Sequence, residues 1–188
     1  MPKTVTLIRH AKSAVLDGVP EPDWPLTEQG HQQARDLVGL FADSSIAGVH
    51  ASPFLRAVDT VRPLARALRI TVRVHPDLRE RHVQDTLIDP FEAFMDVMRR
   101  SFADPDFALP GGESNRQIAD RGWAALEKIL DTYDENEHIV VASHGNLISA
   151  MLQRLEPRIG FAFWQELPNP AIIMLERDTG GWQILDIP

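Results

Sequence analysis

The sequence contains no cysteine. Disulfide bonds, thiolate metal sites and a cysteine nucleophile are therefore excluded from its structure and chemistry. It also lacks an apolar run long enough to cross a bilayer. Its first residues form a strand-like segment, 3–9, instead of a signal peptide. From these absences we expect a cytoplasmic protein that does not use a membrane as its partner.

Basic residues are in the minority: 19 Lys and Arg stand against 27 Asp and Glu, which gives a net charge of −8 at pH 7. We expect no nucleic-acid partner, because a polyanion needs a positively charged footprint. The protein as a whole would also repel a small phosphate ligand. The counter-charges for such a ligand must therefore be concentrated at one place, and arginines without an obvious structural role are the residues of interest.

The 188 residues, of which 44% are apolar and 24% charged, are enough for one soluble globular domain. We interpret residues 1–188 as a single domain. Strand-like and helix-like segments alternate over most of the chain, which predicts a three-layer α/β/α fold with a mostly parallel central sheet. The expected strands are 3–9, 46–51, 70–74, 139–142, 171–176 and 182–187, and the expected helices are 28–41 (with Thr27 as N-cap), 53–68, 89–102, 114–133 and 146–155.

Polar residues follow three of the expected strands. Ligands of parallel sheets bind beyond the carboxyl ends of the strands, so these residues are candidates for a site. The first strand ends in Arg9-His10, and the most apolar strand is followed by His144-Gly145 at a helix start. Arg56 falls in the first turn of another helix, where the dipole disfavours a cation unless an anion lies nearby. Together these side chains and helix N-termini would suit a dianionic phosphoryl group.

Five short motifs occur in a fixed order along the chain. They are Leu7-Ile-Arg-His-Ala11, Ser52-Pro-Phe-Leu-Arg-Ala57 with Thr60, Leu78-Arg-Glu80, Pro110-Gly-Gly-Glu-Ser114 and Ala142-Ser-His-Gly145. This order resembles the histidine phosphatase superfamily, and within it the phosphoglycerate-mutase-like branch. The motifs span residues 7–145, and the remaining residues fit the same fold.

The resemblance implies a histidine acid-type phosphomonoesterase, a hydrolase that needs neither a metal nor a cofactor. His10 would attack phosphorus and become a phosphohistidine. Arg9, Arg56 and His144 would neutralise the phosphoryl oxygens, because electrostatic stabilisation does most of the work in phosphoryl transfer. The small phosphorylated substrate would be bound by Arg9, Ser13, Arg56, His144 and Gly145.

Glu80 would complete the catalytic set as the proton donor. A carboxylic acid must be protonated to act first as an acid, so its pKa should be raised or the pH optimum mildly acidic. The chain departs from the family pattern after Glu80, where a common Gly and Trp are absent, and Glu113 is therefore the reserve candidate. It also has Ala11 for the usual Gly, and Leu16 where many members have a phosphate-binding Asn, a contact that Ser13 would replace.

Three alternative functions remain beside hydrolysis of phosphate monoesters. They are a phosphoglycerate-type phosphomutase, a phosphohistidine-protein phosphatase and a non-catalytic module that binds phosphorylated ligands. The short chain favours hydrolysis over the mutase reaction, and the presence of both histidines and both arginines counts against a pure binding module. The oligomeric state is left open, with a homodimer as one option.

Two aromatic groups complete the sequence pattern. Helical spacing predicts a packing face made of Phe91, Phe94, Met95, Met98 and Phe102. This stripe lies between Glu80 and the Gly-Gly turn, so residues 82–112 are also a candidate lid that would favour an apolar or bulky leaving group. Near the C-terminus, a second group is expected to form a subunit contact or to close the core: Phe161, Phe163 and Trp164.

Overall fold

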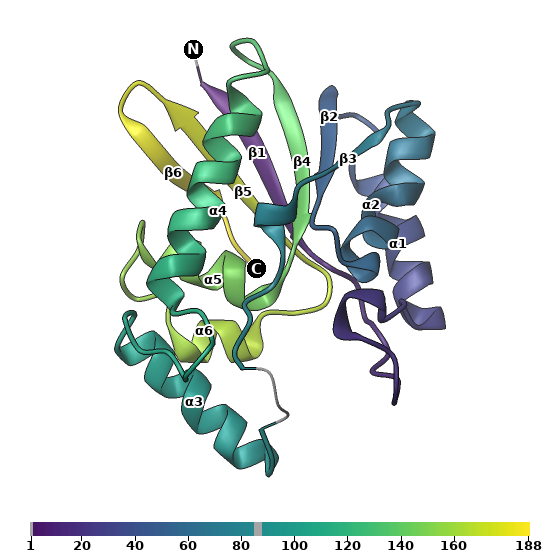
Figure 1. The fold of residues 1–188 in the computed structure, drawn as a ribbon. Helices are drawn as coiled ribbons and strands as arrows, with labels where there is room; N and C mark the ends of the chain where they lie inside the picture. Colours follow the sequence, from purple (N-terminus) through teal and green to yellow (C-terminus); the bar gives the residue numbers. More distant parts are fainter. Residues whose placement is uncertain (1, 85–87) are drawn as a thin grey trace.

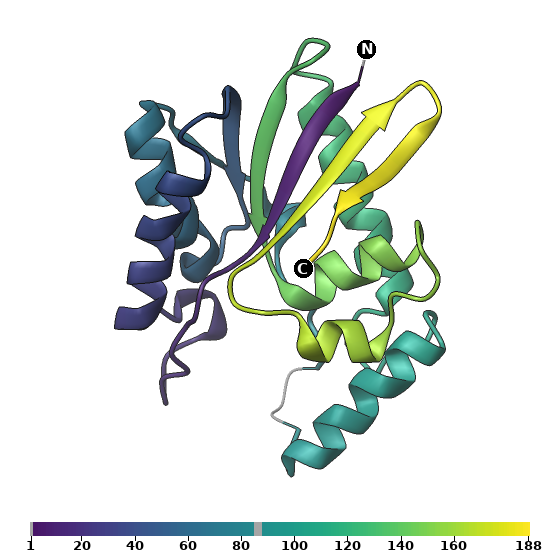
Figure 2. The same ribbon diagram turned by 180° about the vertical axis from the view of Figure 1, so that it is seen from behind.

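The computed structural model describes residues 2–84 and 88–188. Within these ranges, six strands form one sheet in the order β3-β2-β4-β1-β5-β6. The strands are β1 Lys3–Arg9, β2 Ile46–Ala51, β3 Val72–Val74, β4 His138–Ser143, β5 Ala171–Asp178 and β6 Gly181–Asp186. The first four are parallel to one another, whereas β5 and β6 form an antiparallel hairpin at one edge, seen from behind in Figure 2.

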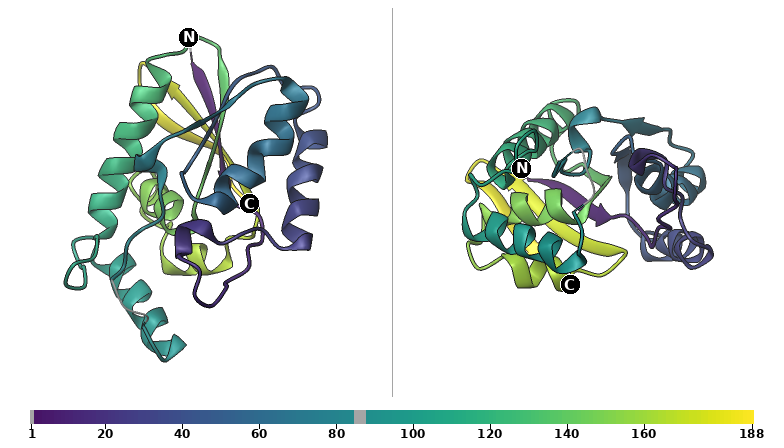
Figure 3. Two further views of the ribbon diagram at one scale, coloured as in Figure 1. Left: turned by 45° about the vertical axis from the view of Figure 1, so that its right-hand side comes forward. Right: turned by 60° about the horizontal axis from the view of Figure 1, so that its bottom comes forward.

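Helices cover both faces of this sheet (Figures 1 and 3). The helices are α1 Glu28–Leu40, α2 Leu55–Leu68, α3 Phe91–Ala103, α4 Asn115–Leu130, α5 Gly145–Gln153 and α6 Phe161–Glu166, with short 3₁₀ turns η1 Glu21–Asp23 and η2 Pro76–Leu78. Helices α1 and α2 lie on one face, and α4 and α5 on the other. The predicted three-layer α/β/α fold with a mostly parallel sheet is therefore confirmed. Helix α6 was not predicted, because its six residues are too few to show a helical period.

The two central strands, β1 and β4, direct apolar residues to both faces of the sheet because both faces are covered there. In β1, Val5 and Leu7 pack into the core beneath α4 and α5, whereas Ile8 packs into the core beneath α1 and α2. Neighbouring strand residues point to opposite faces, so a strand with a core on each side needs apolar residues at nearly every position. Each such aliphatic side chain contributes about 1.5–3 kcal/mol when it is fully buried.

The strand register brings the ends of three parallel strands to one level. Arg9 of β1 pairs with Ser143 of β4, and Ala51 of β2 pairs with Ala142 of the same strand. The residues that follow these positions therefore leave the sheet side by side. Helices α3 and α6 lie beyond this same edge, below the sheet in Figure 1.

Side-chain caps fix the starts of helices α1 and α4. The predicted N-cap Thr27 accepts a hydrogen bond from Gly30 N at 3.0 Å, and α4 begins with a capping box formed by Ser114 and Gln117. A cap of this kind stabilises a helix by about 1 kcal/mol. Thr27 N also donates to Lys12 O at 2.9 Å, so the start of α1 holds the loop that follows β1.

The candidate lid, residues 82–112, includes positions 85–87, which lie outside the described residues. In α3, Met98 and Phe102 are buried and confirm the expected packing face, but Phe91 is 66% exposed, so for this residue the expectation is wrong. The Trp164 ring lies 6.3 Å from that of Phe94 and 6.2 Å from that of Phe102. Trp164 therefore packs α6 against α3 within the chain. That residues 82–112 act as a lid over the site stays a prediction.

We expect Gly30→Ala to destabilise the protein by about 1–3 kcal/mol, as overpacking does. A Cβ at this position would overlap the backbone carbonyl of Lys12, which cannot move without displacing the loop after β1. Gly39→Ala in the same helix is the matched control, since its Cβ would meet nothing within 4 Å. This control should be about 0.5–1 kcal/mol more stable than the native protein. Urea unfolding measures the stability of both variants. Equal stability of the two would contradict the close approach of Gly30 to the Lys12 carbonyl.

Candidate functional site

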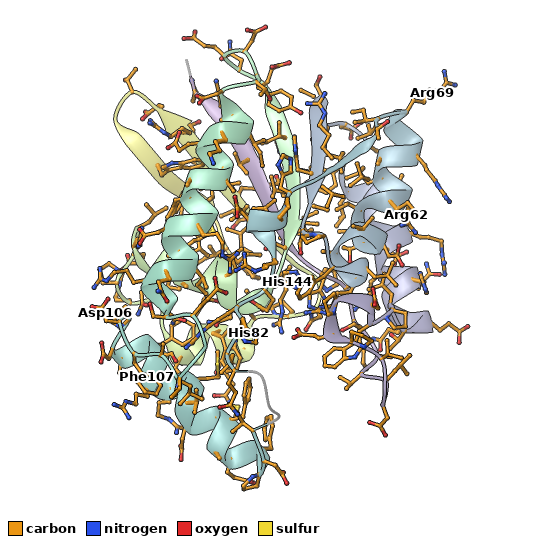
Figure 4. The ribbon with its side chains drawn as sticks, viewed as in Figure 1. Arg62, Arg69, His82, Asp106, Phe107 and His144 are labelled. Carbon is orange, nitrogen blue, oxygen red and sulfur yellow. The ribbon has the colours of Figure 1, made fainter. Side chains whose placement is uncertain are left out.

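Four of the predicted site residues meet at the carboxyl edge of the sheet. Arg9 ends β1 and His10 follows it, Arg56 lies in the first turn of α2, and His144 is the N-cap of α5. The ring centroids of His10 and His144 are 5.3 Å apart, and Arg56 Nε donates to His10 Nε2 at 3.2 Å. In Figure 4, His144 lies between the helical layers at the lower end of the sheet.

The imidazole of His10 is held in one tautomer. Its Nδ1 lies 2.8 Å from Ala11 O, and because a carbonyl oxygen can only accept, the proton is on Nδ1 and the lone pair on Nε2. Burial, followed by the positive charges of Arg56 and Arg9, lowers the pKa of His10 to about 3. At ordinary pH the ring is therefore neutral, and Nε2 is a nucleophilic nitrogen.

The backbone on either side of His10 is tied to its neighbours. Ala11 N donates to Thr60 Oγ1 at 2.9 Å, and Thr60 Oγ1 donates to Arg56 O at 2.6 Å. From the other side, Asn169 Nδ2 donates to His10 O at 2.7 Å. The Ala11 side chain is fully buried, so the extra methyl relative to the usual glycine fills core space and stays clear of solvent.

Arg56 is buried, and its guanidinium is already occupied by Glu21. Its Nη2 donates to Glu21 Oε1 at 2.7 Å and its Nη1 to Glu21 O at 2.9 Å, while the Phe54 and Trp24 rings lie 4.9 and 5.8 Å from its Cζ. This carboxylate is the anion that the position of Arg56 at a helix start requires. Glu21 was not among the predicted site residues, because a carboxylate in a proline-rich loop carries no periodicity or motif.

Arg9 lies against the start of α5. Its Nη1 donates to Leu167 O, and its Nε is buried with no hydrogen-bond partner among the described residues. A Cβ on Gly145 would stand 3.0 Å from both Nε and Cζ of Arg9. Glycine at this position therefore leaves the space that the guanidinium fills. Burial lowers the pKa of Arg9, and the nearby charge of Glu80 opposes this effect.

His144 is fully buried next to the same group of residues. Its Nε2 lies 2.6 Å from Ser52 Oγ, while its Nδ1 has no hydrogen-bond partner in the described part of the chain. Burial and the charge of Arg56 hold the pKa of His144 well below its ordinary value, so the ring is neutral. Buried polar atoms are nearly always paired, so His144 Nδ1 and Arg9 Nε are two places where a bound ligand would complete the hydrogen bonding.

Glu80 caps the start of α5 from the adjacent loop. Its Oε1 accepts from Arg81 N at 2.9 Å and Leu147 N at 3.1 Å, and its Oε2 accepts from Asn146 N at 3.1 Å. The expectation that the N–H groups at this helix start face a phosphoryl group is therefore wrong for Asn146 and Leu147. Burial raises the pKa of Glu80, although these hydrogen bonds and the charge of Arg56 act in the opposite direction.

Glu113, the reserve candidate, is held by cations. It accepts from Arg79 Nη2 at 2.8 Å, from Arg121 Nη2 at 3.1 Å and from His82 N at 3.0 Å. Burial alone would raise the pKa of Glu113, but the His82 N–H, the Arg121 guanidinium and the charge of Arg79 outweigh it and lower the pKa. Glu113 therefore stays ionised and fixes the loop that carries Glu80.

Of the predicted substrate-binding residues Ser13 and Gly145, Gly145 is in contact with one of the four clustered side chains, whereas Ser13 pairs with Leu26. Gly145 contacts Arg9, as described above. Ser13 forms an isolated antiparallel bridge with Leu26, and within the described residues no hydrogen bond joins its side chain to His10. A contact between Ser13 and a substrate stays a prediction.

We expect Glu21→Gln to bind inorganic phosphate about fivefold more tightly than the native protein, since an incoming anion must compete with the Glu21 carboxylate for Arg56. A half-exposed ion pair of this kind is worth roughly 1 kcal/mol. Asp23→Asn makes the same charge change in the same 3₁₀ turn and should leave the affinity nearly unchanged. Isothermal titration calorimetry provides the measurement. Weaker binding by Glu21→Gln would mean instead that Glu21 orients Arg56 for the anion.

Proteins of known sequence and structure resemble this chain over most of its length. Phosphoglycerate mutase-like protein 4 of Arabidopsis thaliana is 30% identical over 143 residues, which are 72% of this chain and 62% of that protein. A metal-independent phosphoserine phosphatase of the same plant is 28% identical over 170 residues, covering 80% of this chain and 68% of the relative. The native structure of a mycobacterial glucosyl-3-phosphoglycerate phosphatase matches the fold with a TM-score of 0.79 at 23% identity, covering 100% of this chain and 98% of that one.

The match to a family model is equally extensive. The model of the histidine phosphatase superfamily (branch 1) covers residues 5–187. This range includes all five motifs and both edges of the sheet. The chain therefore belongs to the histidine phosphatase superfamily, in its phosphoglycerate-mutase-like branch.

Proposed function

We propose that this protein hydrolyses phosphate monoesters without a metal ion, through a phosphohistidine formed on His10. One observation carries the proposal: a neutral, buried imidazole presents a lone pair on Nε2 beside Arg56 and next to His144. A neutral nitrogen nucleophile among fixed cations and hydrogen-bond donors is suited to phosphoryl transfer. The phosphatases among the related proteins support the same reaction class.

The first step transfers the phosphoryl group to the protein. The Arg56 Nε–H that caps His10 Nε2 turns to a phosphoryl oxygen when the substrate enters, which frees the lone pair. Nε2 then forms a bond to phosphorus while the bond from phosphorus to the leaving oxygen breaks. Glu80 donates its proton to that oxygen, so an alcohol leaves and Glu80 becomes a carboxylate.

The second step releases phosphate. A water molecule attacks the phosphorus of the phosphohistidine and gives one proton to Glu80, and the bond between phosphorus and His10 Nε2 breaks. Inorganic phosphate and neutral His10 result, with Glu80 again protonated. Arg9, Arg56 and His144 offer hydrogen bonds to the oxygens throughout, so that the charge in the transition state is stabilised by groups already in position.

We expect His10→Ala to lose more than about a thousandfold of the native activity, because the covalent route is removed. The assay is hydrolysis of 4-nitrophenyl phosphate with EDTA present, from mildly acidic to neutral pH. His31→Ala, an exposed histidine on α1, is the matched control and should retain full activity. An inactive native protein would contradict the proposed phosphatase. Equal activity of native protein and His10→Ala would mean that His10 is not the nucleophile.

We expect Glu80→Gln to slow hydrolysis of an alkyl phosphate by about 10²–10⁴-fold, which is the contribution of a positioned acid. Hydrolysis of 4-nitrophenyl phosphate should slow far less, since nitrophenolate leaves without a proton. Burial raises the pKa of Glu80, so the acid is present below that pKa and lost as the pH rises through it. The His10 ring is already neutral above a pKa of about 3.

The pH profile of kcat/KM should therefore fall on its alkaline side in the native protein, and this fall should be smaller in Glu80→Gln. Glu113→Gln tests the reserve candidate under the same conditions and should keep the native alkaline limb. If Glu113→Gln, and not Glu80→Gln, loses the limb and discriminates between the two leaving groups, Glu113 is the proton donor.

A further inference from the structure

A cavity of about 220 Å³ opens directly beside Arg9, between α3 and α6. It is lined by Arg9, Phe91, Met95, Trp164 and Gln165. We propose that this cavity binds the leaving group of the substrate and that this group is apolar, carries no charge of its own and contains an aromatic ring. The inference rests on the proposed function, which has the phosphoryl group bonded to the Arg9 guanidinium.

Arg9 connects the cavity to the reacting atoms. Its guanidinium lies against Gly145 at the start of α5, and its buried Nε lacks a partner in the described part of the chain. The same side chain forms one wall of the cavity. A phosphate ester whose phosphoryl group bonds to Arg9 therefore extends its organic group towards α3 and α6.

The far wall of the cavity is aromatic and supported from behind. The Phe91 ring is stacked on that of Phe94 at 6.2 Å, and the Trp164 ring packs against those of Phe94, Phe102 and Phe161 at 6.3, 6.2 and 5.7 Å. Phe91 itself is 66% exposed. A ligand ring placed against it would remove this apolar surface from water and would meet a wall that is already ordered.

The described lining of the cavity offers no free counter-charge to a charged leaving group. Among the described residues that line it, Arg9 is the only charged one, and the other polar side-chain groups are the neutral amide of Gln165 and the indole N–H of Trp164. A carboxylate or ammonium on the leaving group would lose its hydration there without gaining a counter-charge, because Arg9 is engaged with the phosphoryl group. Phosphoserine and phosphoglycerate are therefore disfavoured. The volume is below the about 300–1,000 Å³ of pockets for drug-sized ligands, which limits the group to a small ring system.

Binding of phosphonates tests the inference independently of turnover, because a phosphonate cannot be hydrolysed. We expect the native chain to bind benzylphosphonate at least about tenfold more tightly than methylphosphonate in calorimetric titrations, a difference of about 1.4 kcal/mol. Phe91→Ala should abolish most of this difference and leave methylphosphonate binding unchanged. Leu40→Ala is the matched control, since Leu40 is 65% exposed but lies on α1. Truncating such exposed side chains leaves the core intact.

Turnover of three esters separates this inference from the proposed function. The native protein should show a higher kcat/KM for 1-naphthyl phosphate than for phosphoserine or 3-phosphoglycerate, and Phe91→Ala should reduce this preference. Preference for a charged ester, or equal binding of the two phosphonates, would overturn the inference even if the protein is a phosphatase. If benzylphosphonate binds as expected but no ester is hydrolysed, the cavity assignment stands and the proposed function fails.

Discussion

The guanidinium groups of Arg9, which is half-buried, and Arg56, which is buried, are the constraint on which the rest of this site depends. Arg9 and Arg56 would be costly to bury without compensation, because an unpaired charge in the protein interior loses its hydration. The structure places one carboxylate near each: Glu21 forms a hydrogen-bonded ion pair with Arg56, and Glu80 lies where its charge acts on Arg9. The same positive charges, together with burial, keep His10 neutral.

The two carboxylates are held in different ways, and this difference matters for the chemistry. Glu21 is half-exposed on a 3₁₀ turn, so solvent can receive it when an anion takes its place on Arg56. Glu80 is half-buried and held by three backbone N–H groups. The ion pairs of Glu113 with Arg79 and Arg121 hold the loop that carries it. The site thus contains one exchangeable anion, Glu21, and one carboxyl group, Glu80, whose protonation can change in place.

Helices α3 and α6, which lie outside the sheet layers, line the cavity beside Arg9. In Figure 4, Arg62 of α2 and its C-cap residue Arg69 lie on the outer side of that helix. Arg9 instead ends β1, and Arg56 lies in the first turn of α2, so both are at the carboxyl edge of the sheet. Helices α3 and α6 add an aromatic wall beside Arg9. The sheet edge provides the groups for a phosphoryl oxygen, and the two helices surround what is attached to it.

The sequence by itself determined the layered fold and the motifs at the strand ends, because buried parallel strands need apolar residues on both faces and His10 and His144 stand next to such strands. Only the tertiary structure decided which groups compensate the arginines. Glu21 is 35 residues from Arg56 along the chain, and Trp164 meets Phe94 across an even longer separation. Contacts of this kind depend on how loops and short helices pack, which local periodicity does not encode.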